Sequence, residues 1–275
     1  MKKYVIYYFS GTGNTWWVAD RLRSLLLQQG NEVGMFAIET LSYEDVIKQV
    51  KECDHIIIGF AVTGSTAHIN MRRFVKDIPS SDVRKPVSVY GTHALASGDS
   101  AWHIGSMLVE KGYELRHAVQ IRMMNNFHLP KFRFTKPDNG ERLERLLNRA
   151  EVRVEALAQA IINDKPVLRG NHLIAHMVGG FQRSGIDSVV KSLYKDFGVD
   201  HERCIDCGRC VRICPVKNIY KAEGTYHFDE RCVLCMRCYH QCPKSAIYIG
   251  RESLDERKYP RYRGPSKGFK IEDTI

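Results

Sequence analysis

Residues 204–215 (CIDCGRCVRICP) and 232–243 (CVLCMRCYHQCP) repeat one pattern, in which two, two and three residues separate the cysteines and proline follows the last of them. Each cysteine of the second run lies 28 positions after its counterpart in the first, as Cys232 does after Cys204. Eight of the nine cysteines belong to this repeat. A duplicated cysteine pattern of this density predicts that the C-terminal part of the chain is built around metal.

The spacing is the one that holds 4Fe-4S clusters in bacterial-type ferredoxins, where the fourth cysteine of each run ligates the other cluster. Three thiolates at intervals of three residues on a tight loop can converge on three corners of a cube. The fourth must come from elsewhere, because so short a loop cannot wrap a cluster. The prediction is therefore two crossed ligand sets, the first of Cys204, Cys207, Cys210 and Cys242 and the second of Cys214, Cys232, Cys235 and Cys238.

Other uses of cysteine fit this pattern less well. Structural zinc takes two C-x2-C pairs and would leave four spare thiols. A disulfide framework needs an oxidising compartment, but the chain opens with MKKYVI and runs directly into a strand pattern, so no signal peptide is expected. Covalent haem attachment requires a histidine after the cysteine pair, and neither Cys210 nor Cys238 is followed by one.

Length and charge limit the number of domains and the classes of partner. A chain of 275 residues has room for about two domains, and no apolar run approaches the roughly 20 residues that span a bilayer. We therefore expect a cytoplasmic protein. The formal net charge of +10 could indicate a nucleic-acid partner, but the basic residues are scattered and no nucleic-acid motif is present. Anionic cofactors would offset much of this charge, and the remainder favours an acidic redox partner.

The N-terminal stretch predicts a phosphate site. Residues 3–9 (KYVIYYF) form a β-branched and aromatic run typical of a strand buried on both faces of a parallel sheet. The loop SGTGNT follows, and a helical pattern begins at Trp16, which places backbone N–H groups and a helix N-terminus before a ligand. Trp16 occupies the third glycine position of the dinucleotide fingerprint, and the lysine of a Walker loop is absent. The loop therefore favours a terminal monophosphate, as in the flavodoxin loop for the phosphate of FMN.

The pattern that follows alternates strands and helices and predicts an α/β, doubly wound, parallel five-stranded sheet. The expected strands are residues 3–9, 32–38, 55–60, 86–92 and 113–122, and the expected helices are residues 16–29, 42–51, 69–76, 100–111 and 141–163. Ligands of such folds bind outside the carboxyl ends of the strands. This rule brings together three loops, at residues 10–15, 61–68 and 92–99. The first would hold the phosphate, and the other two would flank the isoalloxazine ring.

Taken together, these motifs resemble the fused flavodoxin–ferredoxin proteins of anaerobic bacteria and archaea, from residue 1 to about residue 250. The resemblance implies FMN in a flavodoxin-like domain at 1–165, a partly helical linker at 166–199 and a small α+β ferredoxin domain with two 4Fe-4S clusters at 200–250. A polar tail at 251–275 is expected to be loosely held, and Gly179 and Gly180 suggest a bend in the linker. The residues expected to bind FMN are Ser10, Gly11, Thr12, Gly13, Asn14, Thr15, Val62, Thr63, Gly64, Ser65, Thr92, His93 and Gly98.

Family members often carry Pro and Tyr in the second flavin loop, where this chain has FAVTGS at 60–65, so a more open pocket is expected. The main functional hypothesis is an electron-transfer protein that relays electrons between the clusters and FMN, and on to a partner protein or substrate. One alternative is a flavin-dependent reductase that acts directly on a small molecule, and another is a redox-sensing regulatory protein. No catalytic acid–base pair and no nicotinamide-binding fingerprint stand out in the sequence, which favours the carrier.

Overall fold

A mostly parallel sheet forms the centre of the N-terminal part of the chain. The computed structural model describes residues 1–133, 135–266 and 269–275. The sheet has seven strands in the order β2-β1-β3-β5-β6-β7, with β4 paired to β3. Its strands are β1 (Lys3–Phe9), β2 (Glu32–Ala37), β3 (His55–Thr63), β4 (Thr66–Ala67), β5 (Pro86–His93), β6 (Glu114–Arg122) and β7 (Val167–Leu168).

All five predicted strands are present, and the order of the long strands is that of flavodoxin-like folds. The prediction of five strands was incomplete, because two strands of two residues each also join the sheet. Strand β4 pairs antiparallel with the end of β3, and β7 extends the edge by pairing with β6. Segments this short carry too little hydrophobic alternation to be recognised in a sequence.

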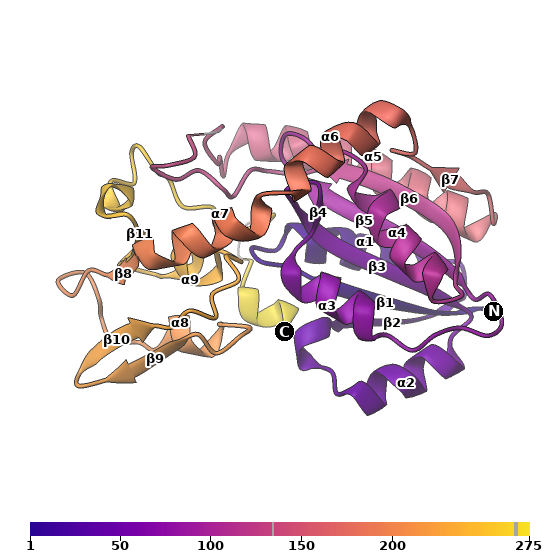
Figure 1. Cartoon of the computed structure of the whole chain (residues 1–275), viewed down its shortest axis with the longest axis horizontal. Coiled ribbons are helices and arrows are strands. Elements are labelled where there is room, and N and C mark those ends of the chain that lie inside the picture. Colours follow the sequence, from indigo (N-terminus) through magenta and orange to yellow (C-terminus); the bar gives the residue numbers. More distant parts are fainter. Residues whose placement is uncertain (134, 267–268) are drawn as a thin grey trace.

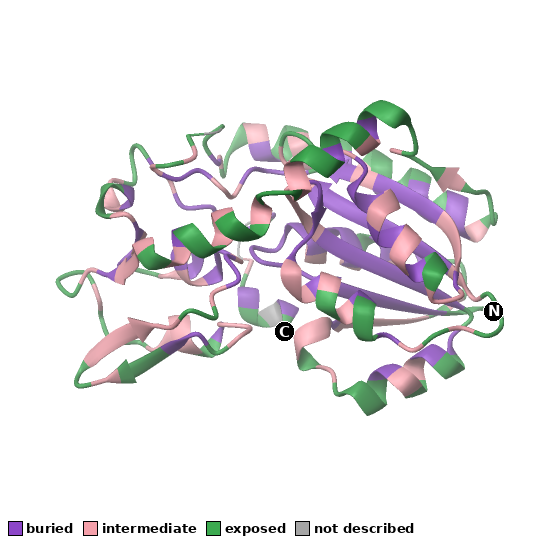
Figure 2. Ribbon diagram, in the orientation of Figure 1, coloured by how far each residue is buried: buried purple, intermediate pink, exposed green. Residues whose placement is uncertain are grey.

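Helices cover both faces of the sheet (Figure 1). Strand β1 explains why, because its side chains alternate between two cores, with Val5, Tyr7 and Phe9 in one and Tyr4, Ile6 and Tyr8 in the other. Helices α2, α3 and α4 pack on the first core, and α1 and α5 pack on the second. Figure 2 shows the central strands β1, β3 and β5 as mostly buried. The helices are α1 (Asn14–Leu27), α2 (Tyr43–Glu52), α3 (Ile69–Asp77), α4 (Ser100–Glu110) and α5 (Glu141–Ile162), with a short 3-10 helix η1 (Ile38–Thr40) after β2.

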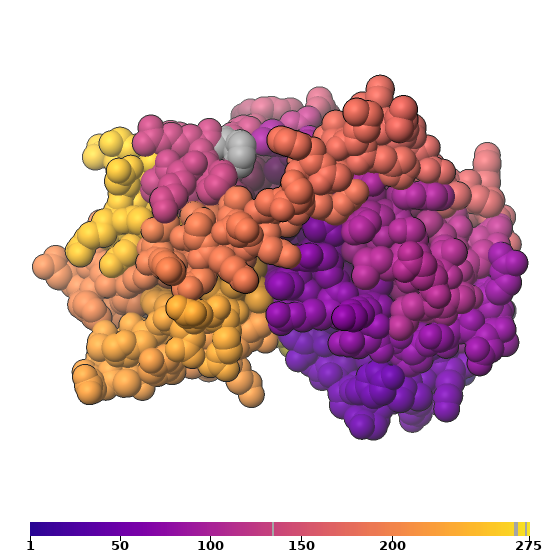
Figure 3. Space-filling view, viewed as in Figure 1, coloured from indigo at the N-terminus to yellow at the C-terminus, as the bar shows by residue number. Residues whose placement is uncertain are grey.

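Two helices, α6 (Leu173–Arg183) and α7 (Ile186–Leu193), run from the sheet to the C-terminal part and lie across the junction (Figures 1 and 3). The expected bend at Gly179 and Gly180 was wrong, since α6 continues through both residues and ends at Arg183. A Cβ at Gly179 would lie 1.9 Å from Asp99 Oδ1. Glycine is therefore needed there for a close approach of the helix to Asp99, and not for a change of direction.

The C-terminal part contains two short antiparallel strand pairs and two helices that lie within the cysteine runs. Strand β8 (Phe197–Val199) pairs with β11 (Ile247–Ile249), and β9 (Ile219–Ala222) pairs with β10 (Thr225–Phe228). Helix α8 (Arg209–Arg212) and helix α9 (Arg237–Gln241) occupy equivalent places in the two repeats. Ile219 and Ile247, which occupy equivalent positions after the two Cys-Pro pairs, are both buried. The 3-10 helices η2 (Tyr194–Asp196), η3 (Arg251–Leu254) and η4 (Ile271–Thr274) complete the chain.

The expectation of a loosely held tail was wrong for the part of 251–275 that the structure describes; residues 267 and 268 lie outside it. Tyr259, Tyr262 and Ile271 are buried, and the C-terminus lies between the two parts of the molecule (Figure 1). The Tyr262 hydroxyl donates to Asn14 Oδ1 at 2.6 Å, and the Tyr8 hydroxyl donates to the Thr274 carbonyl at 2.9 Å. A few apolar side chains in a polar segment were enough to anchor it.

Candidate cofactor sites

The eight cysteines of the repeat surround two separate cavities. One is lined by Cys204, Cys207, Cys210 and Cys242, and the other by Cys214, Cys232, Cys235 and Cys238. The fold therefore brings together the same two quartets that the spacing grouped. Among the described residues, no three His, Cys, Asp or Glu side chains converge closely enough for a single metal ion; each quartet instead encloses a space between its thiols.

Burial shapes the chemistry of these thiols. It raises the pKa of Cys210 to about 11, of Cys232 to about 11 and of Cys235 to about 12, and neighbouring cysteines add to the rise. Iron binds the deprotonated thiolate, so cluster binding has to displace the thiol protons. Groups that stabilise the negative charge on sulfur therefore favour binding. Backbone amides contribute to such a site, since the N–H groups of Asn218 and Ala246 donate to the sulfurs of Cys214 and Cys242 at 3.2 Å. The donor set and the enclosed spaces fit iron–sulfur clusters.

A third cavity of about 400 Å³ lies at the carboxyl ends of β1, β3 and β5, against the cysteine loop of the second quartet. Its volume falls within the usual range for cofactor sites, and its walls are mainly apolar with a few polar groups. The residues that line it are Phe9, Gly11, Ala61, Val62, Thr63, Gly64, Ser65, His68, His93, Ala94, Leu95, Ala96, Asn125, Asn126, Phe127, Phe132, Gln182, Ile186, Val189, Val190, Leu234, Cys235 and Met236.

The structure places the predicted flavin residues in two groups. Gly11, His93 and all four residues of the second loop (Val62, Thr63, Gly64 and Ser65) line this cavity. The others lie outside its walls: Ser10, Thr12, Gly13, Asn14, Thr15, Thr92 and Gly98. Of these, Gly98 packs on the second loop, where a Cβ would lie 2.5 Å from Ser65 Oγ.

The sequence did not predict the part of the 400 Å³ cavity wall that comes from segments far away in the chain. Residues of the segment after β6, the α6–α7 segment and the second cysteine run all reach this cavity, among them Asn126, Gln182, Ile186 and Met236. No local motif marks them, because they meet only through the packing of the C-terminal part on the sheet. The segment MMNNF at 123–127, which follows β6, contains no motif that points to this cavity.

The loop at residues 10–15 is held by hydrogen bonds within the loop and to Thr92 and Asn126. The Thr15 and Thr92 hydroxyls share a hydrogen bond of 2.8 Å, and Thr12 Oγ1 accepts from Asn126 Nδ2 at 2.6 Å. The Gly13 amide donates to Ser10 Oγ at 3.1 Å. Since α1 begins at Asn14, the amides of its first turn have no partner within the helix and carry the positive end of its dipole. This arrangement suits a phosphate.

Gly13 is the residue that shapes this loop most strictly. Its φ of +98° is strained for any residue with a side chain. A Cβ there would lie 2.5 Å from Phe269 and 2.6 Å from Pro265, so the C-terminal tail packs directly over the loop. Trp16, at the start of α1, also contacts Phe269, with ring centroids 5.5 Å apart. The tail is therefore a wall of the phosphate loop.

The second cysteine run touches both the 400 Å³ cavity and the loop at residues 10–15. A Cβ on Gly11 would lie 2.2 Å from the carbonyl oxygen of Cys235, and Cys235 lines both its own quartet's cavity and the 400 Å³ cavity. His68 Nε2 donates to the Val233 carbonyl at 2.5 Å, and burial lowers the pKa of His68 to about 4, so it is neutral. The 400 Å³ cavity and the cavity of the second quartet are therefore separated only by the backbone of the cysteine run and a few side-chain atoms.

Arg237, between Cys235 and Cys238, ties these elements together. Its side chain is 1% exposed and pairs with Glu39 after β2. The guanidinium also donates to the Ser10 carbonyl at 2.8 Å and lies 5.3 Å from the centre of the Phe9 ring. A buried charge is tolerated only when it is paired in this way. One residue of the cysteine run thus fixes the start of the phosphate loop.

Residues 203–246 match the family model of the 4Fe-4S dicluster domain. No curated protein sequence matches the chain. Among solved structures, a flavodoxin from the domain Archaea shares 16% identity over 58% of this chain and 98% of its own, with a TM-score of 0.40. The flavodoxin of Megasphaera elsdenii shares 21% identity over 57% of this chain and 99% of its own, with a TM-score of 0.39.

Rubredoxin oxygen:oxidoreductase from Desulfovibrio gigas shares 15% identity over 57% of this chain, with a TM-score of 0.39. The chain covers only 37% of the length of that protein. The strand order and the dicluster match together define a fused architecture, with a flavodoxin-like fold followed by a ferredoxin-like iron–sulfur domain. Within the described residues, no helix is long and apolar enough to cross a membrane.

Proposed function

We propose that this chain is a cytoplasmic electron-transfer protein that relays electrons between two 4Fe-4S clusters and FMN, and on to a partner protein or a substrate. Clusters carry single electrons, and a flavin can hold one or two. The observation that supports the relay is the shared position of Cys235. This residue lines the cavity of one cysteine quartet and the cavity proposed for the isoalloxazine ring, and its carbonyl lies against Gly11 of the phosphate loop.

The two quartets differ in exposure, which gives the proposed relay an order. Cys207 of the first quartet is exposed, whereas Cys235 of the second is half-buried and lines the proposed flavin cavity. The first quartet would therefore exchange electrons with an external one-electron carrier. The second would exchange them with the flavin. Lys244 lies at the first quartet's cavity and would favour an acidic carrier.

The test is flavin reduction in the intact protein, purified anaerobically with its cofactors. In stopped flow with a one-electron donor, Cys235→Ser should lose the inner cluster and slow flavin reduction at least about tenfold. Cys53→Ser is the matched control, since Cys53 is buried just before the start of β3, whereas the cavity beside Cys235 is lined by residues at the end of that strand. Equal rates in the two variants would remove the support for the relay, and protein that carries no flavin would remove the proposal itself.

A further inference from the structure

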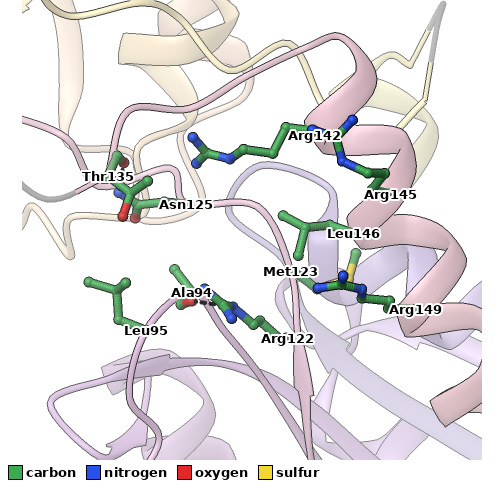
Figure 4. A pocket seen from close by; sticks show the side chains of 10 residues that line it. All are labelled: Ala94, Leu95, Arg122, Met123, Asn125, Thr135, Arg142, Arg145, Leu146 and Arg149. Atoms are coloured by element: carbon green, nitrogen blue, oxygen red, sulfur yellow. Dashed lines mark hydrogen bonds between the residues drawn. The ribbon is translucent and has the colours of Figure 1, made fainter.

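A fourth cavity, of about 200 Å³, lies between α5 and the carboxyl end of β6 (Figure 4). Four arginines line it. Figure 4 shows Arg142, Arg145 and Arg149 projecting from α5, with Arg122 entering from β6 beside Ala94. The remaining wall consists of Ala94, Leu95, Met123, Asn125, Thr135 and Leu146.

The spacing on α5 explains why the cations gather. Positions 142, 145 and 149 follow one another at intervals of three and four residues, which places their side chains on one face of the helix. Arg122 is the last residue of β6, and its Nε donates to the Ala94 carbonyl at 3.1 Å. This contact holds the guanidinium at the mouth of the cavity. Two elements far apart in sequence thus converge on one positively charged space.

These four charges are poorly compensated. None of the residues that line the cavity is acidic. Arg145 pairs with Glu141 at 3.2 Å, but both side chains are largely exposed, so this ion pair is weak. Arg142 donates to the Lys136 carbonyl at 2.8 Å and to Met124 Sδ, and Arg149 has no ion pair or hydrogen bond within the described part of the chain. Like charges gathered around one space repel one another, and an anion of high charge would relieve the repulsion.

The position of the cavity restricts what such an anion could belong to. Ala94, Leu95 and Asn125 line both this cavity and the 400 Å³ cavity proposed for the flavin ring. A ligand held by its charged end among the arginines could therefore extend past these three residues into the larger cavity. Guanidinium groups are permanently charged and bind phosphate oxygens through paired donors, which favours phosphate over other anions.

We propose that the cavity formed by Arg122, Arg142, Arg145 and Arg149 binds the phosphate or pyrophosphate group of a small-molecule ligand whose other end reaches the flavin cavity. The anion site stands on its own geometry; only its role beside a flavin rests on the proposed function. The class of ligand is an organic phosphate or diphosphate. None of the residues that line the arginine cavity belongs to a cysteine quartet, so a carrier protein at the first quartet and a small molecule could be bound together.

The test is titration calorimetry of the intact, cofactor-loaded protein with pyrophosphate in a phosphate-free buffer of low ionic strength. Wild-type protein should bind one pyrophosphate, and R142Q/R149Q should weaken that binding at least about tenfold, since each lost charge-assisted hydrogen bond contributes strongly. R142K/R149K should retain part of the affinity. Arg153→Gln is the matched control, because Arg153 is an exposed residue of the same helix outside the cavity wall; it should change the affinity less than about twofold.

Flavin content, measured on the same samples, separates this proposal from the proposed function. R142Q/R149Q should keep the flavin content of the wild type. If pyrophosphate displaced the flavin, or the double variant lost it, the cavity would belong to the flavin's own phosphate and the proposal would fall. Absence of pyrophosphate binding, or equal binding by wild type and double variant, would also overturn it. If the protein carried no flavin but still bound pyrophosphate through these arginines, the proposed electron relay would be wrong and the anion site would stand.

Discussion

The carbonyl oxygen of Cys235 lies 2.2 Å from the position that a Cβ on Gly11 would occupy. The phosphate loop and the second cysteine run are therefore in contact through backbone atoms, and no side chain fits between them. Gly11 does not have a positive φ, so alanine is unstrained there and tests the contact alone.

Gly11→Ala should push the cysteine run away from the loop. We expect slower flavin reduction by a one-electron donor, by about tenfold or more, with iron content unchanged, because a backbone oxygen cannot rotate away as a side chain can. Stopped-flow absorbance measures the rate. Gly180→Ala is the control, since a Cβ there meets nothing within 4 Å; an equal rate in both variants would show that the contact does not matter for transfer.

Gly13→Val should abolish flavin retention, because valine is strained at a φ of +98° and its side chain would collide with Pro265 and Phe269. The ratio of flavin to protein after gel filtration measures this. Gly30→Val introduces comparable strain at a φ of +74° with no neighbour within 4 Å and should retain flavin. Mass spectrometry of the cofactor released from wild-type protein should show FMN, and FAD would contradict the monophosphate assignment.

Cys214→Ser should damage the cluster held by Cys232, Cys235 and Cys238, although Cys214 lies in the first run. Cys242→Ser should damage the other cluster. Each variant should lose about half of the iron, and cluster-resolved electron paramagnetic resonance should identify which signal disappears. If Cys214→Ser instead lost the signal of the cluster held by Cys204, Cys207 and Cys210, each run would hold its own cluster.

Arg237→Met should lower the free energy of unfolding by about 3–5 kcal/mol, because it leaves the Glu39 carboxylate, whose side chain is only 10% exposed, without its partner. Adding Glu39→Leu should recover part of the loss, since removing both charges is much less costly than removing one. Arg257→Met, at a side chain that is 97% exposed, should change stability by less than about 0.5 kcal/mol. Urea unfolding of the loaded protein measures all three.

Acid should destabilise the junction through His68. Burial lowers its pKa from 6.5 to about 4, so the unfolded chain binds more protons between these values. The stabilisation is therefore complete above about pH 6.5 and is lost as the pH falls through about 4. Between about pH 7 and pH 5 we expect a loss near 2 kcal/mol from this residue. Burial also lowers the pKa of His55, and the clusters are themselves labile in acid. Both effects are the same in wild type and in His68→Gln, so they cancel when the two proteins are compared.

The difference between the two proteins in urea unfolding at these pH values isolates His68. Glutamine can still donate to the Val233 carbonyl but does not titrate, so His68→Gln should lose less stability on acidification than the wild type. The same pH dependence in both would show that His68 does not couple the junction to pH.

The sequence by itself determined most of the local architecture. The continuous β-branched and aromatic run of β1 predicted a strand buried on both faces, and the glycines and hydroxyls at 10–15 predicted a turn before α1, because these features depend on residues close in the chain. The spacing of the cysteines grouped them into the two quartets that the fold surrounds with cavities, since an interval of three residues dictates which thiols share a loop.

The tertiary structure alone decided how the cofactor sites meet. The contact between Gly11 and Cys235 joins residues more than two hundred positions apart, and no motif in either segment predicts it. The same holds for the tail, where Tyr262 and Phe269 close on the phosphate loop, and for the arginines of α5, which face Arg122 only because α5 packs beside β6. Local patterns fix the shape of each element, whereas the environment of a side chain depends on which distant surfaces are buried together.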